Sequence, residues 1–79
     1  MSWKAKLKKD TGWSDVHEAS AQTAAVRFVK AGDEFRLENF AEPLALKSEV
    51  VEVKSPEGHI YECVVNREIG YNASITKIL

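Results

Sequence analysis

The segment from Ala21 to Ala31 carries the clearest periodic signal in the chain and constrains the fold most. At about 100° per residue, its apolar side chains gather on one side of a helix, while Thr23, Arg27 and Lys30 occupy the other side. Because small alanines dominate the apolar side, the helix backbone is expected to pack close to its partner, which favours a sheet over a bundle of bulky helices. The apolar side consists of Ala21, Ala24, Ala25, Phe28, Val29 and Ala31.

The predicted helix has a start signal and a stop signal. The Ser20 side chain can accept hydrogen bonds from the unpaired amides of the first turn. Arg27 and Lys30 lie in the last turn, where positive charge complements the helix dipole, and Gly32 can adopt the left-handed conformation that ends a helix. The sequence therefore predicts a helix that ends at Gly32.

The stretch 33–46 is acidic and has no dominant period. A short strand around residues 35–37 and a single helical turn beginning at Asp33 are both compatible with its pattern. We interpret it as an acidic connection that is anchored by three apolar side chains. These anchors are Phe35, Leu37 and Phe40.

Alternating side chains predict a strand at the beginning of the chain. Trp3, Ala5 and Leu7 alternate with lysines, at the period of two that a pleated strand imposes. Turn-forming residues follow at 9–12, and a second short strand from Trp13 to about Glu18 would complete a hairpin. The second strand alternates poorly, so a bulge or a loop is an alternative there.

The second half of the chain predicts a hairpin around the turn 55–58, where Pro56 presets the turn and Gly58 is free to adopt positive φ. A three-residue loop gives a register that puts the apolar side chains on one face and the charged ones on the other. This register pairs Val51 with Cys63, Val53 with Tyr61 and, on the outer face, Glu52 with Glu62.

A final strand is predicted where Tyr71, Ala73 and Ile75 alternate with polar residues. With 79 residues, of which 44% are hydrophobic, the chain can build one core only. The sequence thus predicts a single small α+β domain spanning residues 1–79. Its antiparallel sheet has four to five strands, and one α-helix packs across one face, in the order β-β-α-β-β-β.

The composition excludes several classes of protein. The chain has no run of about 18 apolar residues, and the charges at residues 1–6 are not followed by an apolar signal core, so we expect a cytoplasmic protein without a membrane segment. A single cysteine, Cys63, forms neither an internal disulfide nor a cysteine-based zinc site. We expect no cofactor and no metal.

No arrangement of residues points to catalysis, so we expect that the chain is not an enzyme. Cys63 and His59 lie four residues apart, which is about 13 Å along a strand and beyond hydrogen-bond reach. Asp15 and His17 share a face of a strand, but two ligands do not make a metal site. The facing glutamates of the second hairpin are expected on the surface, where a lysine from a neighbouring strand can neutralise them.

One candidate function is weak binding of single-stranded nucleic acid by the N-terminal residues, because lysines attract phosphates and indoles stack on unpaired bases. A structural role is the alternative, since lysines on an edge strand block sheet aggregation and tryptophans fill small cores. The net charge of −1 also argues against nucleic acid. The candidate residues are Trp3, Lys4, Lys6, Lys8, Lys9 and Trp13.

The leading hypothesis is a non-enzymatic protein-interaction module. Ile60 and Val64 lie on the strand face opposite Tyr61 and Cys63, so that one strand is apolar on both sides. A protein partner or a second copy of the chain can cover that second side, or an open sheet edge can accept a partner. The alternative is that Trp3 or the acidic connection folds over Ile60 and Val64.

Overall fold

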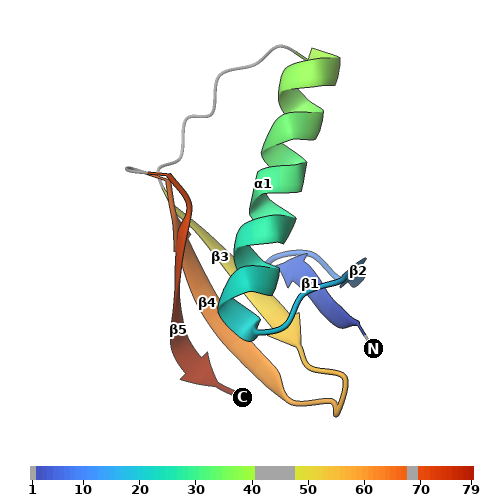
Figure 1. Cartoon of the computed structure of the whole chain (residues 1–79), viewed down its shortest axis with the longest axis vertical. Helices are drawn as coiled ribbons and strands as arrows, with labels where there is room; N and C mark the ends of the chain where they lie inside the picture. Colours follow the sequence, from blue (N-terminus) through green and yellow to red (C-terminus); the bar gives the residue numbers. More distant parts are fainter. Residues whose placement is uncertain (1, 41–47, 68–69) are drawn as a thin grey trace.

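The computed structural model describes residues 2–40, 48–67 and 70–79, apart from the side chains at 36 and 38–40. The described part of the chain has the predicted element order β-β-α-β-β-β, and its five antiparallel strands form one sheet with one helix across a face (Figure 1). The fold class is therefore confirmed. The elements are β1 (Trp3–Leu7), β2 (Ser14–Val16), α1 (Ala21–Phe40), β3 (Ser48–Lys54), β4 (Ile60–Asn66) and β5 (Asn72–Ile78).

The strands lie in the order β2-β1-β3-β4-β5. The first strand, β1, pairs with β2 on one side and with β3 on the other, so its lysines do not lie on an edge strand. The alternative prediction, that these lysines lie on an edge strand and block sheet aggregation, was therefore wrong. After α1 the chain returns to the sheet, and β3 pairs with the side of β1 that β2 leaves open. The edges of the sheet are the three-residue β2 and the seven-residue β5.

The second hairpin has the predicted register. Glu52 lies opposite Glu62, Val51 lies opposite Cys63, and Val53 lies opposite Tyr61. At the turn, the Ser55 amide donates to the His59 carbonyl at 2.8 Å, and Gly58 has a φ of 96°, which only glycine adopts without strain. Local alternation and turn chemistry were sufficient to predict this register, because a shift by one residue would place glutamates opposite Val51 and Tyr61 on the core face.

The core lies between α1 and the sheet and consists of small and medium-sized side chains. Ala24 and Ala25 of α1 are completely buried, which fits the close approach of helix and sheet that the alanines predict. The largest side chains that are fully buried are three valines and a cysteine. The buried core comprises Ala5, Val16, Ala21, Ala24, Ala25, Val29, Val51, Val53, Cys63 and Val65.

The beginning of α1 follows the prediction, whereas its end does not. The Ser20 hydroxyl accepts from the Thr23 amide at 3.3 Å, and the Thr23 hydroxyl accepts from the Ser20 amide at 3.2 Å, as in a capping box. The prediction that Gly32 ends the helix was wrong, because α1 continues to Phe40. Gly32 is not among the glycines with positive φ, which are Gly58 and Gly70.

The expected acidic connection is therefore helical over its first eight residues, from Asp33 to Phe40. Residues 41–46 of that prediction lie outside the described part of the chain. The last turns of α1 project beyond the ends of β3, β4 and β5 (Figure 1). Phe35 and Leu37, which were expected to anchor a connection, are instead 58% and 56% exposed on these turns.

We expect the substitution Gly32→Ala to stabilise the fold. A Cβ at this position meets no atom within 4 Å, and alanine favours a helix interior by about 0.5–1 kcal/mol over glycine. Urea denaturation should show the increase in the free energy of unfolding. Gly58→Ala is the matched control, and it should destabilise because alanine is strained at a φ of 96°. A loss of stability in Gly32→Ala would contradict a continuous helix.

Candidate functional site

The sheet face turned away from α1, here called the open face, carries the alternate residues of β1, β3 and β4. Among the described residues no helix or second sheet packs on it. Three lysines of β1 and the following turn meet carboxylates there: Lys4 Nζ lies 2.7 Å from Asp15 Oδ1, Lys6 Nζ lies 2.8 Å from Glu52 Oε1, and Lys8 Nζ lies 2.7 Å from Glu62 Oε1. The positive charge of the N-terminal strand is thus neutralised within the sheet.

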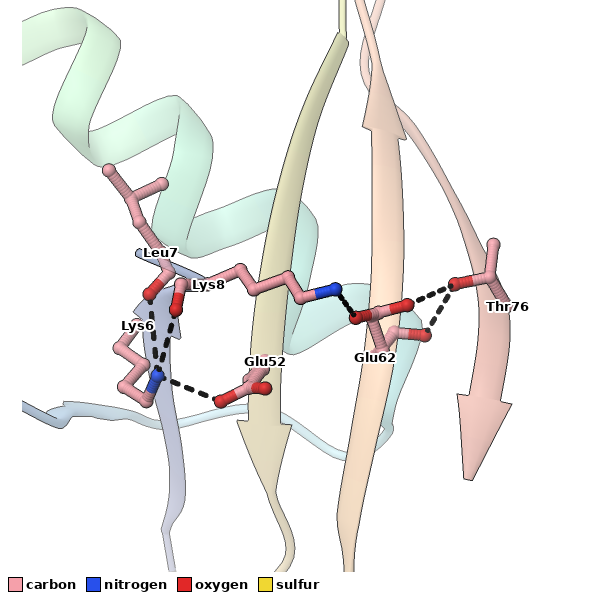
Figure 2. A network of polar contacts seen from close by, with 6 residues as sticks. All are labelled: Lys6, Leu7, Lys8, Glu52, Glu62 and Thr76. Carbon is pink, nitrogen blue, oxygen red and sulfur yellow. Dashed lines mark hydrogen bonds and ion pairs between the residues drawn. The ribbon is translucent and has the colours of Figure 1, made fainter. Parts of the chain in front are cut away.

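Lys6 has a structural position. Its side chain is only 12% exposed, that of Glu52 only 17%, and its ammonium also donates to the Asp10 carbonyl at 2.9 Å. Figure 2 shows this ammonium between Glu52 and the carbonyls of Leu7 and Lys8. Lys6 therefore closes the turn after β1 and is satisfied by partners from its own chain.

Lysines also neutralise the facing glutamates Glu52 and Glu62. Each glutamate has its own lysine from β1 or the following turn, as expected for neutralisation by a neighbouring strand (Figure 2). The hydrogen bond from Lys8 holds the pKa of Glu62 below its usual value, although its own desolvation opposes this. An acid–base pair needs one carboxyl with a raised pKa, and Glu62 shows the opposite shift.

The two indoles of the nucleic-acid candidate set lie on opposite faces of the sheet. Trp3 packs on the helix side, with its ring centroid 6.1 Å from that of Tyr61. Trp13 lies over the open face, where the ammonium groups of Lys6 and Lys54 are 5.3 Å and 4.7 Å from its ring centroid. Lys9 is exposed in the turn after β1. The structure therefore does not bring Trp3, Trp13 and the lysines together on one surface.

Ile60 and Val64 both lie half-buried on the open face, as their alternation predicts. Glu62 with its lysine separates them along β4. Val64 is opposite Val50, which is 36% exposed, whereas Ile60 is opposite Lys54. The apolar side chains of β3 and β4 on the open face therefore form two small, separate patches. One is the pair Val50 and Val64, and the other is Ile60.

The remaining candidate groups do not form a chemical site. Cys63 is buried on the helix side, and burial raises the pKa of its thiol, whereas His59 is exposed in the hairpin turn. Asp15 forms an ion pair with Lys4, and together with His17 it supplies only two candidate metal ligands. Within residues 2–40, 48–67 and 70–79, no three side chains of the metal-binding types cluster.

A buried polar cluster that sequence analysis missed joins α1 to the far end of the sheet. Arg67 donates to Asp33 through Nε at 2.8 Å and through Nη2 at 3.0 Å, and Tyr71 Oη donates to the same carboxylate at 2.7 Å. The side chains of Asp33 and Arg67 are 4% and 10% exposed, and Glu49 lies 3.5 Å from Arg67. The hydrogen bond to Asp33 raises the pKa of Tyr71.

Two hollows flank α1. One, of about 580 Å³, lies between α1 and β2, and its lining mixes apolar side chains with charged groups of both signs, including Arg27, Asp33 and Arg67. The other, here called the α1–β5 groove, has about 370 Å³ and lies beside the edge strand β5. Its lining includes Val26 of α1 together with Tyr71 and Ala73.

The outer edge of β5 is the longest unpaired element in the described part of the chain. All seven residues from Asn72 to Ile78 belong to the strand, and β4 is their only strand partner among the described residues. The ladder shifts register between Glu62 and Cys63, which leaves Thr76 as the extra residue of a bulge. Before this bulge, the strand carries no charge, and Ile75 is 38% exposed.

Comparison with known proteins gives no relative: no protein family, no curated protein and no solved structure matches this chain. No helix in the described part of the chain combines the length and the apolar character that crossing a membrane requires.

We expect Asp33→Ala to destabilise the fold by about 3 kcal/mol, because it leaves the guanidinium of Arg67 buried without its main partner. Tyr71→Phe removes one hydrogen bond and should cost about 1–2 kcal/mol. Urea denaturation followed by tryptophan fluorescence measures both. Glu34→Ala changes an exposed carboxylate on the same helix and should have little effect. Equal stability of Asp33→Ala and Glu34→Ala would show that the cluster does not hold α1.

Proposed function

We propose that this chain is a non-enzymatic interaction module that binds an extended segment of a partner protein at the outer edge of β5. The observation that carries the proposal is the seven-residue edge strand that has no described partner on its outer side. Such an edge presents a row of backbone donors and acceptors to which another strand can add. The side chains beside that row then select the partner.

The two edges of the sheet differ in a way that supports this choice. The β2 edge has three residues, one of which, Asp15, is engaged by Lys4, and so offers little backbone for pairing. The β5 edge is longer and offers uncharged residues from Asn72 to Thr76. The bulge and Lys77 protect only its last part, since bulges and edge lysines discourage pairing. We therefore place the contact at residues 72–76.

The α1–β5 groove provides the side-chain contact for this edge. A strand added beside β5 places every second side chain on the helix side, next to Ala73. The hollow is lined by Val26, Tyr71 and the small Ala73 together with polar and charged residues that include Glu18, Arg27 and Lys30, so an apolar side chain of the partner can pack at its Ala73 end. The backbone pairing gives affinity, and this hollow gives a preference for an apolar residue.

The open face around Ile60 and Val64 stays a candidate contact of the same module. It has less support than the β5 edge because ion pairs interrupt its apolar groups. The proposal also includes the cytoplasmic location expected from the sequence.

Selection of extended peptides from a displayed random library on the immobilised chain tests the function. We expect binders whose addition shifts the backbone amide signals of residues 72–76, and whose affinity falls at least about tenfold in Ile75→Lys. Val50→Lys is the matched control, since Val50 and Ile75 are both β-branched and are 36% and 38% exposed. Shifts confined to Ile60 and Val64 would move the site to the open face, and a failure to select any binder would overturn the proposal.

Nucleic-acid binding through Trp3, Lys4, Lys6, Lys8, Lys9 and Trp13 has little support, because three of these lysines already meet carboxylates at 2.7–2.8 Å. We expect no saturable change of tryptophan fluorescence when a single-stranded oligonucleotide is added at low salt. A saturable change whose affinity falls on the order of a hundredfold between about 50 and 200 mM salt would instead establish phosphate binding.

A further inference from the structure

We propose that the partner of the β5 edge is a second copy of this chain. In this dimer the two β5 strands pair antiparallel about a two-fold axis at Ser74, which joins the two five-stranded sheets into one sheet. The inference rests on the proposed function, because it names the partner for the same edge. It adds a register and a reciprocal side-chain contact.

The register follows from the faces on which the side chains lie. A two-fold axis perpendicular to the sheet keeps each residue on its own face, so every pair across the axis must share a face. Ala73 pairs with Val65 and lies on the helix side, whereas Lys77 pairs with Glu62 and lies on the open side, because the bulge at Thr76 interrupts the alternation. An axis at Ile75 would pair Ala73 with Lys77 and is excluded.

An axis at Ser74 satisfies the same condition over the longest stretch. It pairs Ser74 with Ser74 of the other copy, Ala73 with Ile75, and Asn72 with Thr76. All five residues from Asn72 to Thr76 therefore take part in the pairing. An axis at Ala73 would use only the three residues 72–74 of β5. The axis at Ser74 therefore pairs the largest number of β5 residues, and we choose this arrangement.

This register places a projecting side chain beside a hollow. Ile75, which is 38% exposed, lies next to Ala73 of the other copy, where the α1–β5 groove of about 370 Å³ begins. Because of the two-fold axis, each copy offers one isoleucine and receives one. The projecting Ile75 and the groove beside Ala73 belong to one chain, so a second copy supplies both parts of the contact, which favours a second copy over an unrelated strand.

The charges of the edge are compatible with self-pairing. The paired residues from Asn72 to Thr76 carry no charge, and Lys77 lies just outside them. In the register about Ser74, Lys77 falls next to Tyr71 of the other copy and far from the second Lys77. No like charges meet, and like charges directly opposite each other are what destabilises strand pairs.

The size of the contact sets the expected strength. Five paired residues and one isoleucine from each copy bury less than the roughly 1,600 Å² of a standard interface, so we expect a weak dimer that dissociates on dilution. Sedimentation of the full chain between about 1 µM and 1 mM should show the mass rising from 8.8 kDa towards twice that value.

Two variants locate the contact. Ile75→Lys should weaken self-association at least about tenfold, because it removes the isoleucine and places two charges in the grooves. Val50→Lys, on the open face with nearly the same exposure, should leave self-association unchanged. In the unsubstituted chain, those amides of residues 72–76 that point away from β4 should become protected from hydrogen exchange as concentration rises, and this measurement does not depend on how well a variant folds.

The outcomes separate this inference from the proposed function. A chain that stays monomeric at about 1 mM while displayed peptides still bind residues 72–76 overturns the dimer and keeps strand addition. A dimer that survives Ile75→Lys and is lost in Val50→Lys overturns the β5 contact and moves it to the open face. If neither self-association nor peptide binding is found, both proposals fail.

Discussion

The close contact between the alanine side of α1 and the sheet is the interaction on which the rest of the structure depends. Ala24 and Ala25 are fully buried, and the side chains that meet them from the sheet are valines and Cys63. Small side chains allow the helix to approach the sheet closely, but each one buries little apolar area. A single helix on such a core covers one face only. The opposite face is instead stabilised by lysine–glutamate pairs, and the outer edge of β5 has no strand partner among residues 2–40, 48–67 and 70–79.

The cluster of Asp33, Arg67 and Tyr71 explains why α1 continues past Gly32. A glycine inside a helix costs about 1 kcal/mol relative to alanine, which is a weak stop signal. One residue later, Asp33 accepts two bonds from Arg67 and one from Tyr71, and its carboxylate is almost completely buried. Such a charge-assisted bidentate contact is stronger than an ordinary hydrogen bond. It holds the helix at the end of the sheet, and the following turns project beyond it.

The features that the sequence predicted correctly are local ones. The register of β3 and β4 follows from alternation and from one turn, and the start of α1 follows from the Ser20 cap. The features that it missed join distant residues: Asp33 lies 34 residues from Arg67, and β1 meets β3 only after the helix has returned the chain. The sequence also did not predict the exposed position of Ile75 or the groove beside Ala73, because an edge strand is recognised only when the order of strands is known.

The difference between the two sheet edges also determines how far strand addition can proceed. Two-fold pairing at β5 uses the long edge of both copies and leaves only the three-residue β2 edges outside. Those edges are short, and Asp15 on them is engaged by Lys4, so further addition has little backbone to use. The bulge at Thr76 prevents a continuous match along the whole of β5, which works against fibrous stacking. An isologous contact of this kind closes on itself, so the proposed pairing at this edge would give a dimer and not a growing sheet.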